Sequence, residues 1–370
     1  MIGNSTARLE EPLTDRERFV RTMHYQPVDR IPIWDFGFWE QTLVEWRKQG
    51  MPEGVSPDEF FGMDKQWAGV PVSLGMIPGF EEIVYEEDDE TQLVRDGGGV
   101  VCRRSKQGTS IPTFIEFPVK HRADFEAMKE RYNPDDPRRY PQNWGELVKA
   151  FRDRDYALGI GAGGFFGSVR GWMGVENTCM CFHDDPQLMR DMMDFIADFV
   201  CRTIERALSE VEPDHASFWE DMAYNKTSLI SPRMFREFMV PRYQKITRLL
   251  AAHGVDVNVV DCDGRIDELI PLWLEGGVNC MFPLEVGVWR ANAVEYAAQY
   301  GRDLLMIGNI SKRALSGSRA DVEREVMSKV PPLLKRGGYI PTPDHRVPPD
   351  VPLANYQYYL ELIRQVAAAG

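Results

Sequence analysis

Two aspartates, two residues apart, end an apolar run near the middle of the chain, V-D-V-N-V-V-D-C-D-G over residues 255–264. A β-branched run of this kind is typical of a buried parallel strand, and its acidic tip of the strand's carboxyl end. Because side chains alternate along a strand, Asp261 and Asp263 share one face and Cys262 takes the other. Neighbouring carboxylates repel each other, so they require a metal ion, a cationic neighbour or a bound proton. Alternatively, one of the two caps a helix that starts near Ile266.

Polar side chains also follow the other runs that the sequence predicts to be strands. In chain order, the residues at these ends are Asp35, Gly163-Gly164-Phe165, Trp219-Glu220-Asp221, Asp261 with Asp263, Glu285, Asn309 and Asp344-His345. Five of these seven ends carry an acid, which is more than helix capping alone predicts. Simpler interpretations stay open. Lys226 or Arg233 could pair with an acid after the 215–219 run, and Glu285 could interact with the positive end of the next helix.

His345 is the histidine among these strand-end residues. It stands in a proline-rich stretch, residues 341–350, whose backbone must be rigid. A histidine held on a rigid loop suits acid–base chemistry or metal binding, because its pKa lies near neutrality. Together with Asp261 and Asp263 it could supply three ligands to a divalent metal. This set is rich in oxygen for zinc and would equally admit other divalent ions.

Alternating strand and helix patterns predict the elements that position these residues. Strands are expected at 30–35, 156–160, 215–219, 255–261, 278–282, 303–309 and 339–341, and helices at 15–25, 41–48, 122–131, 143–153, 184–210, 232–252, 265–275, 290–300, 319–335 and 352–368. Seven or eight such units favour a closed (β/α)8 barrel, an α/β fold whose active site lies at the carboxyl ends of the strands.

An antiparallel β excursion over residues 82–104 interrupts the N-terminal half of this pattern. Three short apolar runs and the turn signal Asp96-Gly97 indicate a β-hairpin insertion. The glycines of 161–164 lack the spacing of a phosphate-binding loop and instead favour a close approach of backbone to a ligand or a neighbouring strand. We interpret residues 1–370 as one barrel domain with this single insertion.

Composition excludes several classes of protein. The net charge of −14 and the absence of a basic stripe disfavour a nucleic-acid partner. No apolar run is long enough to span a membrane, and the polar first residues contain no signal-peptide core. Six cysteines in 370 residues form no disulfide framework, so we expect a cytoplasmic protein. Cys179, Cys181 and Cys280 are interpreted as core residues.

Several motifs together resemble the uroporphyrinogen decarboxylase-like superfamily. They are Arg16-Glu-Arg-Phe19, Pro27-Val-Asp-Arg-Ile-Pro32, Asp261-Cys-Asp-Gly264, Gly276-Gly-Val-Asn279 with Pro283-Leu-Glu285, Ile307-Gly-Asn309, and Gly337-Gly-Tyr-Ile-Pro341 through Pro348-Pro-Asp350. The resemblance spans about Arg16 to Gln365. It implies a (β/α)8 barrel with the site at its carboxyl face and a possible homodimer. The superfamily holds tetrapyrrole decarboxylases and corrinoid- or coenzyme M-dependent methyltransferases, so the fold does not choose between them.

Departures from the family patterns favour the methyltransferase branch. The decarboxylases open with an arginine-rich segment that grips substrate carboxylates, whereas residues 30–39 contain no arginine after Arg30. Zinc-dependent members carry His-x-Cys at the central strand and a distant cysteine. Here Asp261-Cys262-Asp263 and Asp344-His345 stand in those places, which disfavours zinc-thiolate chemistry. Demethylases of methoxylated aromatics, which use carboxylates and histidine, are more similar.

The sequence therefore leads to the hypothesis of a corrinoid-dependent methyltransferase of the O-demethylase type. It would move a methyl group from a small, methoxylated compound to a corrinoid protein. The expected catalytic residues are Asp261, Asp263, His345 and Glu220, the first three also binding a divalent metal such as zinc. The expected substrate-binding residues are Trp34, Asp35, Phe36, Trp39, Phe165, Trp219, Asp221, Glu285 and Asn309.

Two alternatives stay open at this point. One is a decarboxylase-type carbon–carbon lyase acting on a tetrapyrrole or a smaller acid, with Arg170, Lys312 and Arg346 as its cationic clamp. The other is a non-catalytic corrinoid-binding or regulatory module.

Overall fold

The computed structural model describes residues 12–106 and 111–369. Most of the polar N-terminal segment that argued against a signal peptide lies outside the described residues. No described helix is long and apolar enough to cross a membrane.

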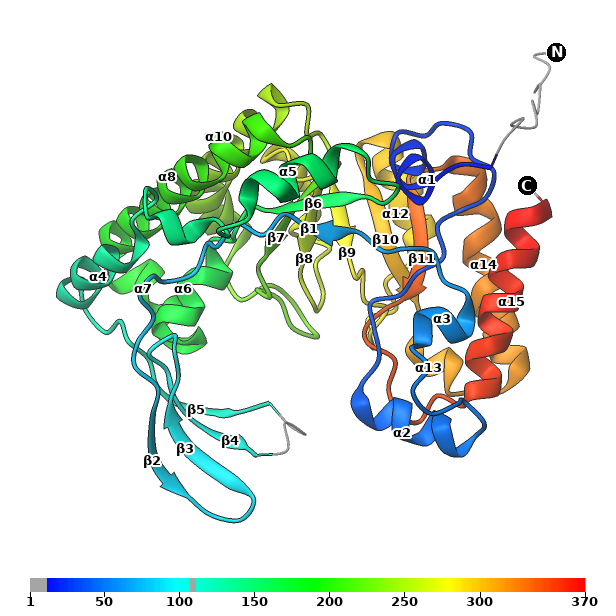
Figure 1. Cartoon of the computed structure of the whole chain (residues 1–370), viewed down its shortest axis with the longest axis horizontal. Helices are drawn as coiled ribbons and strands as arrows, with labels where there is room; N and C mark the ends of the chain where they lie inside the picture. The colour runs from blue at the N-terminus through cyan, green and yellow to red at the C-terminus, as the bar shows by residue number, and fades with distance from the viewer. Residues whose placement is uncertain (1–11, 107–110, 370) are drawn as a thin grey trace.

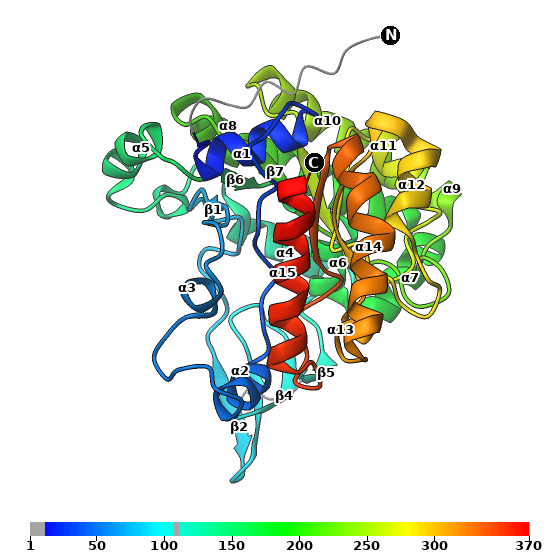
Figure 2. The ribbon, with the colours of Figure 1, turned by 90° about the vertical axis from the view of Figure 1, so that its right-hand side faces the viewer.

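Seven parallel strands form one curved sheet, in the spatial order β1-β6-β7-β8-β9-β10-β11 (Figure 1). Their bounds are β1 Ala68–Gly69, β6 Leu158–Gly161, β7 His215–Trp219, β8 Asn258–Asp261, β9 Cys280–Phe282, β10 Leu305–Ile310 and β11 Tyr339–Pro343. Long helices cover the outside of this sheet, as Figures 1 and 2 show: α8 Pro186–Glu210, α10 Val240–Ala252, α14 Arg319–Arg336 and α15 Leu353–Ala369. The predicted barrel-like α/β architecture is confirmed, with seven paired strands in place of the eight of a closed barrel.

Both faces of the parallel sheet are buried, which explains why its strands are continuously apolar in sequence. Alternate side chains point inward and form a core inside the barrel, namely Val257, Val259, Cys280, Phe282, Leu305, Ile307 and Ile340. The intervening side chains pack against the outer helices, namely Val260, Met281, Met306 and Tyr339. Cys181 and Cys280 are buried free thiols, in agreement with the expected core role.

The predicted strand at 30–35 is wrong. In the described residues this segment joins no strand ladder, although it contributes Trp34 to the interior core. Pro32 has no amide hydrogen to donate, and the amide of Ile33 is taken by a side chain, Asp64 Oδ2, at 2.8 Å. The hydrogen-bonded sheet is therefore open between β11 and β1, and an extended segment stands where an eighth strand was expected.

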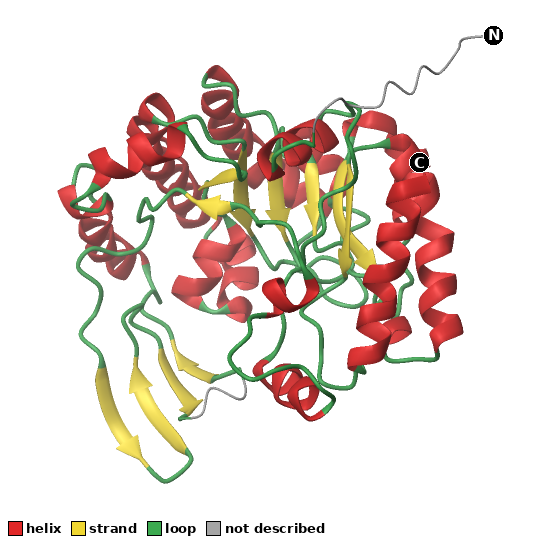
Figure 3. Ribbon diagram, turned by 45° about the vertical axis from the view of Figure 1, so that its right-hand side comes forward, coloured by secondary structure: helices red, strands yellow, loops and turns green. Residues whose placement is uncertain are grey.

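The β excursion is a separate antiparallel sheet of four strands, which Figure 3 shows standing away from the barrel. The strands are β2 Ile83–Glu87, β3 Thr91–Arg95, β4 Val101–Ser105 and β5 Thr113–Glu116. The predicted turn is present, since Asp96 Oδ1 accepts from the amides of Gly98 and Val100 at 2.9 Å each. The predicted range of 82–104 leaves out the fourth strand, β5. This strand has only four residues, all exposed, so no alternation of apolar and polar residues marks it in the sequence.

The remaining helices are α1 Asp15–Met23, α2 Glu40–Lys48, α3 Pro57–Phe61, α4 Arg122–Lys129, α5 Trp144–Arg152, α6 Phe166–Met173, α7 Val175–Asp184, α9 Pro232–Met234, α11 Ile270–Glu275, α12 Ala293–Tyr300 and α13 Lys312–Leu315. Thr14 caps α1 in a capping box with Glu17, which explains its sharp start. The helix predicted at 232–252 is interrupted by a π-helical turn at Phe235–Met239, just before Pro241, which cannot donate a helical hydrogen bond.

Candidate functional site

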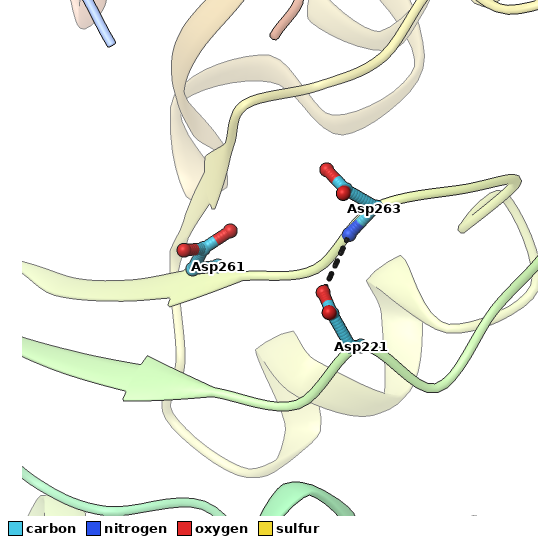
Figure 4. Close-up of side chains that lie close together, drawn as sticks. All are labelled: Asp221, Asp261 and Asp263. Carbon is cyan, nitrogen blue, oxygen red and sulfur yellow. Dashed lines mark hydrogen bonds between the residues drawn. The ribbon is translucent and has the colours of Figure 1, made fainter. Parts of the chain in front are cut away.

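Three aspartates meet at the carboxyl ends of two neighbouring strands, β7 and β8 (Figure 4). Asp261 is the last residue of β8, Asp263 lies two residues beyond it, and Asp221 follows β7. One carboxylate oxygen from each lies within 4.8 Å of the others. Parallel strands in register bring their ends to one edge of the sheet, so acids distant in sequence converge here.

Asp221 is held in place by its own backbone and by Arg170. Its φ of +44° is a left-handed conformation, uncommon for a residue with a side chain. Arg170 Nη1 donates to the Asp221 carbonyl at 2.6 Å and lies 3.6 Å from its carboxylate Oδ2. The Arg170 guanidinium also stacks over the Trp219 ring at 5.2 Å. Asp221 Oδ1 then accepts the amide of Asp263 at 3.3 Å, the contact dashed in Figure 4.

His345 completes the cluster from the loop after β11. Its Nε2 lies 3.3 Å from Asp263 Oδ2. The imidazole is half-buried between two aromatic rings: Phe36 meets it edge-on at 5.4 Å, and Trp39 lies nearly parallel to it at 6.3 Å. The rigid loop predicted from its prolines thus holds His345 against Asp263.

The electrostatics of this cluster favour a bound proton. Burial, followed by repulsion from Asp263 and Asp221, raises the pKa of Asp261 to about 7. The contact with Asp263 raises the pKa of His345, although burial opposes this shift. Asp261 therefore exchanges a proton near neutral pH, and the contact with Asp263 favours the protonated form of His345. A histidine whose charged form is favoured by a carboxylate is suited to act as a general acid.

The same side chains fit a divalent cation that prefers oxygen ligands. Asp263 Oδ1 is buried without a hydrogen-bond partner among the described residues, which leaves an acceptor for such an ion. Three carboxylates with a histidine beside them are a hard donor set. Cys262 is fully buried, its sulfur 3.4 Å from the amide of Met222. The structure brings Asp221, Asp261 and Asp263 together as carboxylate donors, and His345, the third residue of the predicted set, lies beside Asp263.

A cavity of about 400 Å³ opens beside Asp263. It is lined by the loops after β7 to β11: Ala223, Tyr224, Asn225, Asp263, Gly264, Glu285, Gly287, Val288, Trp289, Ser311, Lys312, Arg313 and Asp344. Gly264, with φ +91°, allows these loops to meet, since a Cβ there would lie 2.7 Å from the Ala223 backbone. The Gly264 amide donates to Glu285 Oε2 at 2.9 Å, so Glu285 braces the loop that carries Asp263.

Glu220 lies behind the cavity, not in it. It is fully buried, and both carboxylate oxygens accept backbone amides, Phe165 at 2.8 Å and Gly167 at 2.9 Å. The Tyr243 hydroxyl donates to it as well. This arrangement is possible because Gly164 lets α6 approach β7, where a Cβ would come within 1.9 Å of the Trp219 carbonyl. The expected ion pair with Lys226 or Arg233 is therefore wrong for Glu220.

The three other predicted polar residues have mainly structural contacts. Asp35 is buried, accepts from the Tyr356 hydroxyl, and has its pKa raised by burial to about 7. Asn309 is buried and donates to the carbonyls of Leu284 and Ala291, so it fixes the loop after β9. Asp344 lines the cavity but accepts backbone amides with both carboxylate oxygens.

The predicted aromatic residues divide between the site and the core. Phe36 and Trp39 contact His345, and Trp219 is 45% exposed beside Arg170. Trp34 and Phe165 are buried, Trp34 against Trp67 and Phe165 against Tyr243. The structure thus brings the first three to the site and leaves the last two in the core.

The capping alternative for Asp263 is wrong. Helix α11 starts at Ile270 with no side-chain cap, and the Asp263 carboxylate faces His345 instead. Sequence reasoning missed Tyr224, Trp289 and Arg313, which line the cavity. Their only signal was their place in loops after predicted strands, because their residue types by themselves indicate no site.

The family model of uroporphyrinogen decarboxylase (URO-D) matches residues 14–366. The chain belongs to this family. Among solved structures, a methyltransferase from Methanosarcina mazei has a TM-score of 0.63 and 15% sequence identity, with 95% of this chain and 99% of that chain covered. At this identity the likeness shows the fold. No curated protein matches the sequence.

The three cationic residues expected to bind the carboxylates of a decarboxylase substrate each contact another group of the protein. Arg170 is occupied by Asp221, Lys312 Nζ lies 3.0 Å from Glu285, and Arg346 lies over the Trp39 ring at 5.6 Å. A tetrapyrrole with eight carboxylates would meet three clustered aspartates, and these three cations do not form a clamp around it.

Proposed function

We propose that this protein is a methyltransferase that moves a methyl group from a small methylated compound, best a methoxylated one, to a corrinoid carried by a partner protein. The observation that carries the proposal is the contact of His345 with Asp263 beside Asp261. Supporting it are the fold shared with the Methanosarcina methyltransferase and the engaged arginines.

In the proposed reaction His345 is the general acid. The bond between the methyl carbon and its heteroatom breaks, and the methyl group passes to the acceptor without the bonding electrons. The electron pair stays on the heteroatom, which takes the proton from His345 Nε2 and leaves as an alcohol, phenol, amine or thiol. Asp263 keeps the imidazole oriented and cationic, and Asp261 returns the proton from solvent.

A reduced corrinoid on the partner protein would supply the nucleophile that accepts the methyl group. A divalent cation held by Asp221, Asp261 and Asp263 would polarise the same heteroatom as a Lewis acid. Phe36 and Trp39 lie next to the His345 ring, and their apolar surface lowers the local polarity, which strengthens the electrostatic interactions between charges there.

The test is methyl transfer to free cob(I)alamin, followed by its absorption, with a panel of methoxylated, N-methylated and S-methylated compounds. We expect turnover with at least one methoxylated compound. Elemental analysis of the purified protein and of Asp263→Ala shows whether a metal takes part. Absence of transfer from every compound, with the protein folded, would contradict the proposal.

The second candidate is a lyase of the decarboxylase type, favoured by the raised pKa of Asp261, which could protonate a carbanion. Release of carbon dioxide from a carboxylic acid, with no methyl transfer, would replace the first proposal by this one.

A further inference from the structure

We propose that Arg313 binds an anionic group, such as a carboxylate, on the methyl donor, so that the substrate is a methylated organic acid. This inference rests on the proposed function for the methyl group but on separate residues for the anion. It assigns a specificity role to a cation in the wall of the 400 Å³ cavity.

The two cationic side chains that line the cavity differ in whether a carboxylate of the protein neutralises their charge. Lys312 Nζ lies 3.0 Å from Glu285 Oε1, and its charge is thereby neutralised. Arg313 is exposed and lines the same cavity, but it makes no ion pair or side-chain hydrogen bond within the described part of the chain. Arg313 thus brings an uncompensated guanidinium, whose planar array of donors suits a carboxylate.

The acids that line the cavity, in contrast to Arg313, mostly have partners within the protein. Glu285 is occupied by Lys312 and by the Gly264 amide, at 3.0 and 2.9 Å. Asp344 accepts the amides of Lys312 and Val286 at 2.9 and 3.0 Å. Only Asp263 retains an oxygen without a partner among the described residues. That oxygen is itself buried and the other Asp263 oxygen contacts His345, so Arg313 is the charged side chain of the cavity that no described residue matches.

Aromatic side chains form a further part of the cavity wall. The Trp289 ring folds back over Gly287, where φ is +56° and a Cβ would lie 2.3 Å from the ring. Tyr224 lines the same cavity. A volume near 400 Å³ lies within the range of small-molecule sites. A fitting ligand has an apolar body, a methyl-bearing heteroatom at one end and an anion at the other.

Binding measurements separate this inference from the reaction itself. Titration calorimetry with 4-methoxybenzoate, the probe, is compared with 4-methoxybenzamide, which has nearly the same shape without the charge. We expect the wild type to bind the acid more tightly than the amide. Arg313→Gln should weaken binding of the acid about tenfold and leave the amide unchanged, as expected for one charge-assisted contact.

Arg290→Gln is the matched control, because Arg290 is an exposed arginine of the neighbouring loop that does not line the cavity. It should bind both probes like the wild type. Equal binding of acid and amide by the wild type, or no change in Arg313→Gln, would overturn the inference even if methyl transfer is observed. Conversely, loss of acid binding in Arg313→Gln supports the anion site even if no transfer occurs.

Discussion

The acids around the barrel mouth fall into two groups that differ in how their oxygens are satisfied. Glu220 and Asp344 are buried, and backbone amides donate to both oxygens of each. Asp261 accepts no side-chain hydrogen bond in the described chain, and Asp263 keeps one oxygen unpartnered. The first group is saturated by the fold, whereas the second is left open.

At the same end of the barrel, some carboxylates therefore stabilise the fold and others remain available for chemistry. A saturated carboxylate ties a loop to its strand, and its removal leaves buried donors without partners. An open carboxylate contributes repulsion in the free protein and becomes useful only with a proton, a cation or a ligand. Substitutions in the two groups should therefore affect different measurements.

Glu220→Ala should have the largest effect, and it should be on stability. It leaves the amides of Phe165 and Gly167 and the Tyr243 hydroxyl without their acceptor inside the protein. We expect a loss of about 3–5 kcal/mol in the free energy of unfolding, measured in urea. Glu220→Gln keeps one acceptor oxygen and should lose less. A loss below about 1 kcal/mol for the alanine variant would remove the distinction between the two groups.

His345→Gln should affect turnover instead. Without a proton donor at the methyl-bearing heteroatom, the rate of methyl transfer should fall about 100-fold or more. The free energy of unfolding should change by no more than about 0.5 kcal/mol, because His345 is partly exposed. His24→Gln is the control, a histidine that pairs with Asp256 at 3.0 Å away from the site, and it should retain full activity. Unchanged turnover in His345→Gln would refute its role as the acid.

Asp35→Asn should act on a third measurement, the pH dependence of stability. Burial raises the pKa of Asp35 from 3.8 to about 7, so the folded protein keeps a proton that the unfolded chain has lost between these pH values. The contribution of Asp35 to stability therefore falls as pH rises through this window, by up to about 1 kcal/mol per pH unit. Urea unfolding from pH 4.5 to 8 should show a flatter profile for Asp35→Asn. Parallel profiles for the two proteins would show that Asp35 does not titrate in this way.

Local patterns predicted most of the barrel. The range predicted for β7 agrees with the structure residue for residue, and β8 ends at Asp261 as expected, because apolar periodicity and turn residues act over a few positions. The pattern failed for residues 30–35, where the amide of Ile33 is satisfied by Asp64, 31 residues away. It also failed for β5, which is strand only because β4 pairs with it.

The candidate site was predicted in part. Its chemistry is visible in the sequence, since Asp261, Asp263 and His345 follow predicted strands and these ends share one face of a barrel. The sequence did not show that Asp221 would join them while its neighbour Glu220 would not. Consecutive residues point to different sides of the chain, and only the packing of α6 and α10 against β7 decides which side is buried.

The sequence by itself thus determined the order of strands and helices, the family, and the set of acids at the strand ends. The tertiary structure alone decided which of those acids are open. The reason is physical: the donors that saturate Glu220 come from Phe165, Gly167 and Tyr243, at separations of 55, 53 and 23 residues. Contacts of that range are formed by the packing of whole elements, and no local pattern encodes them.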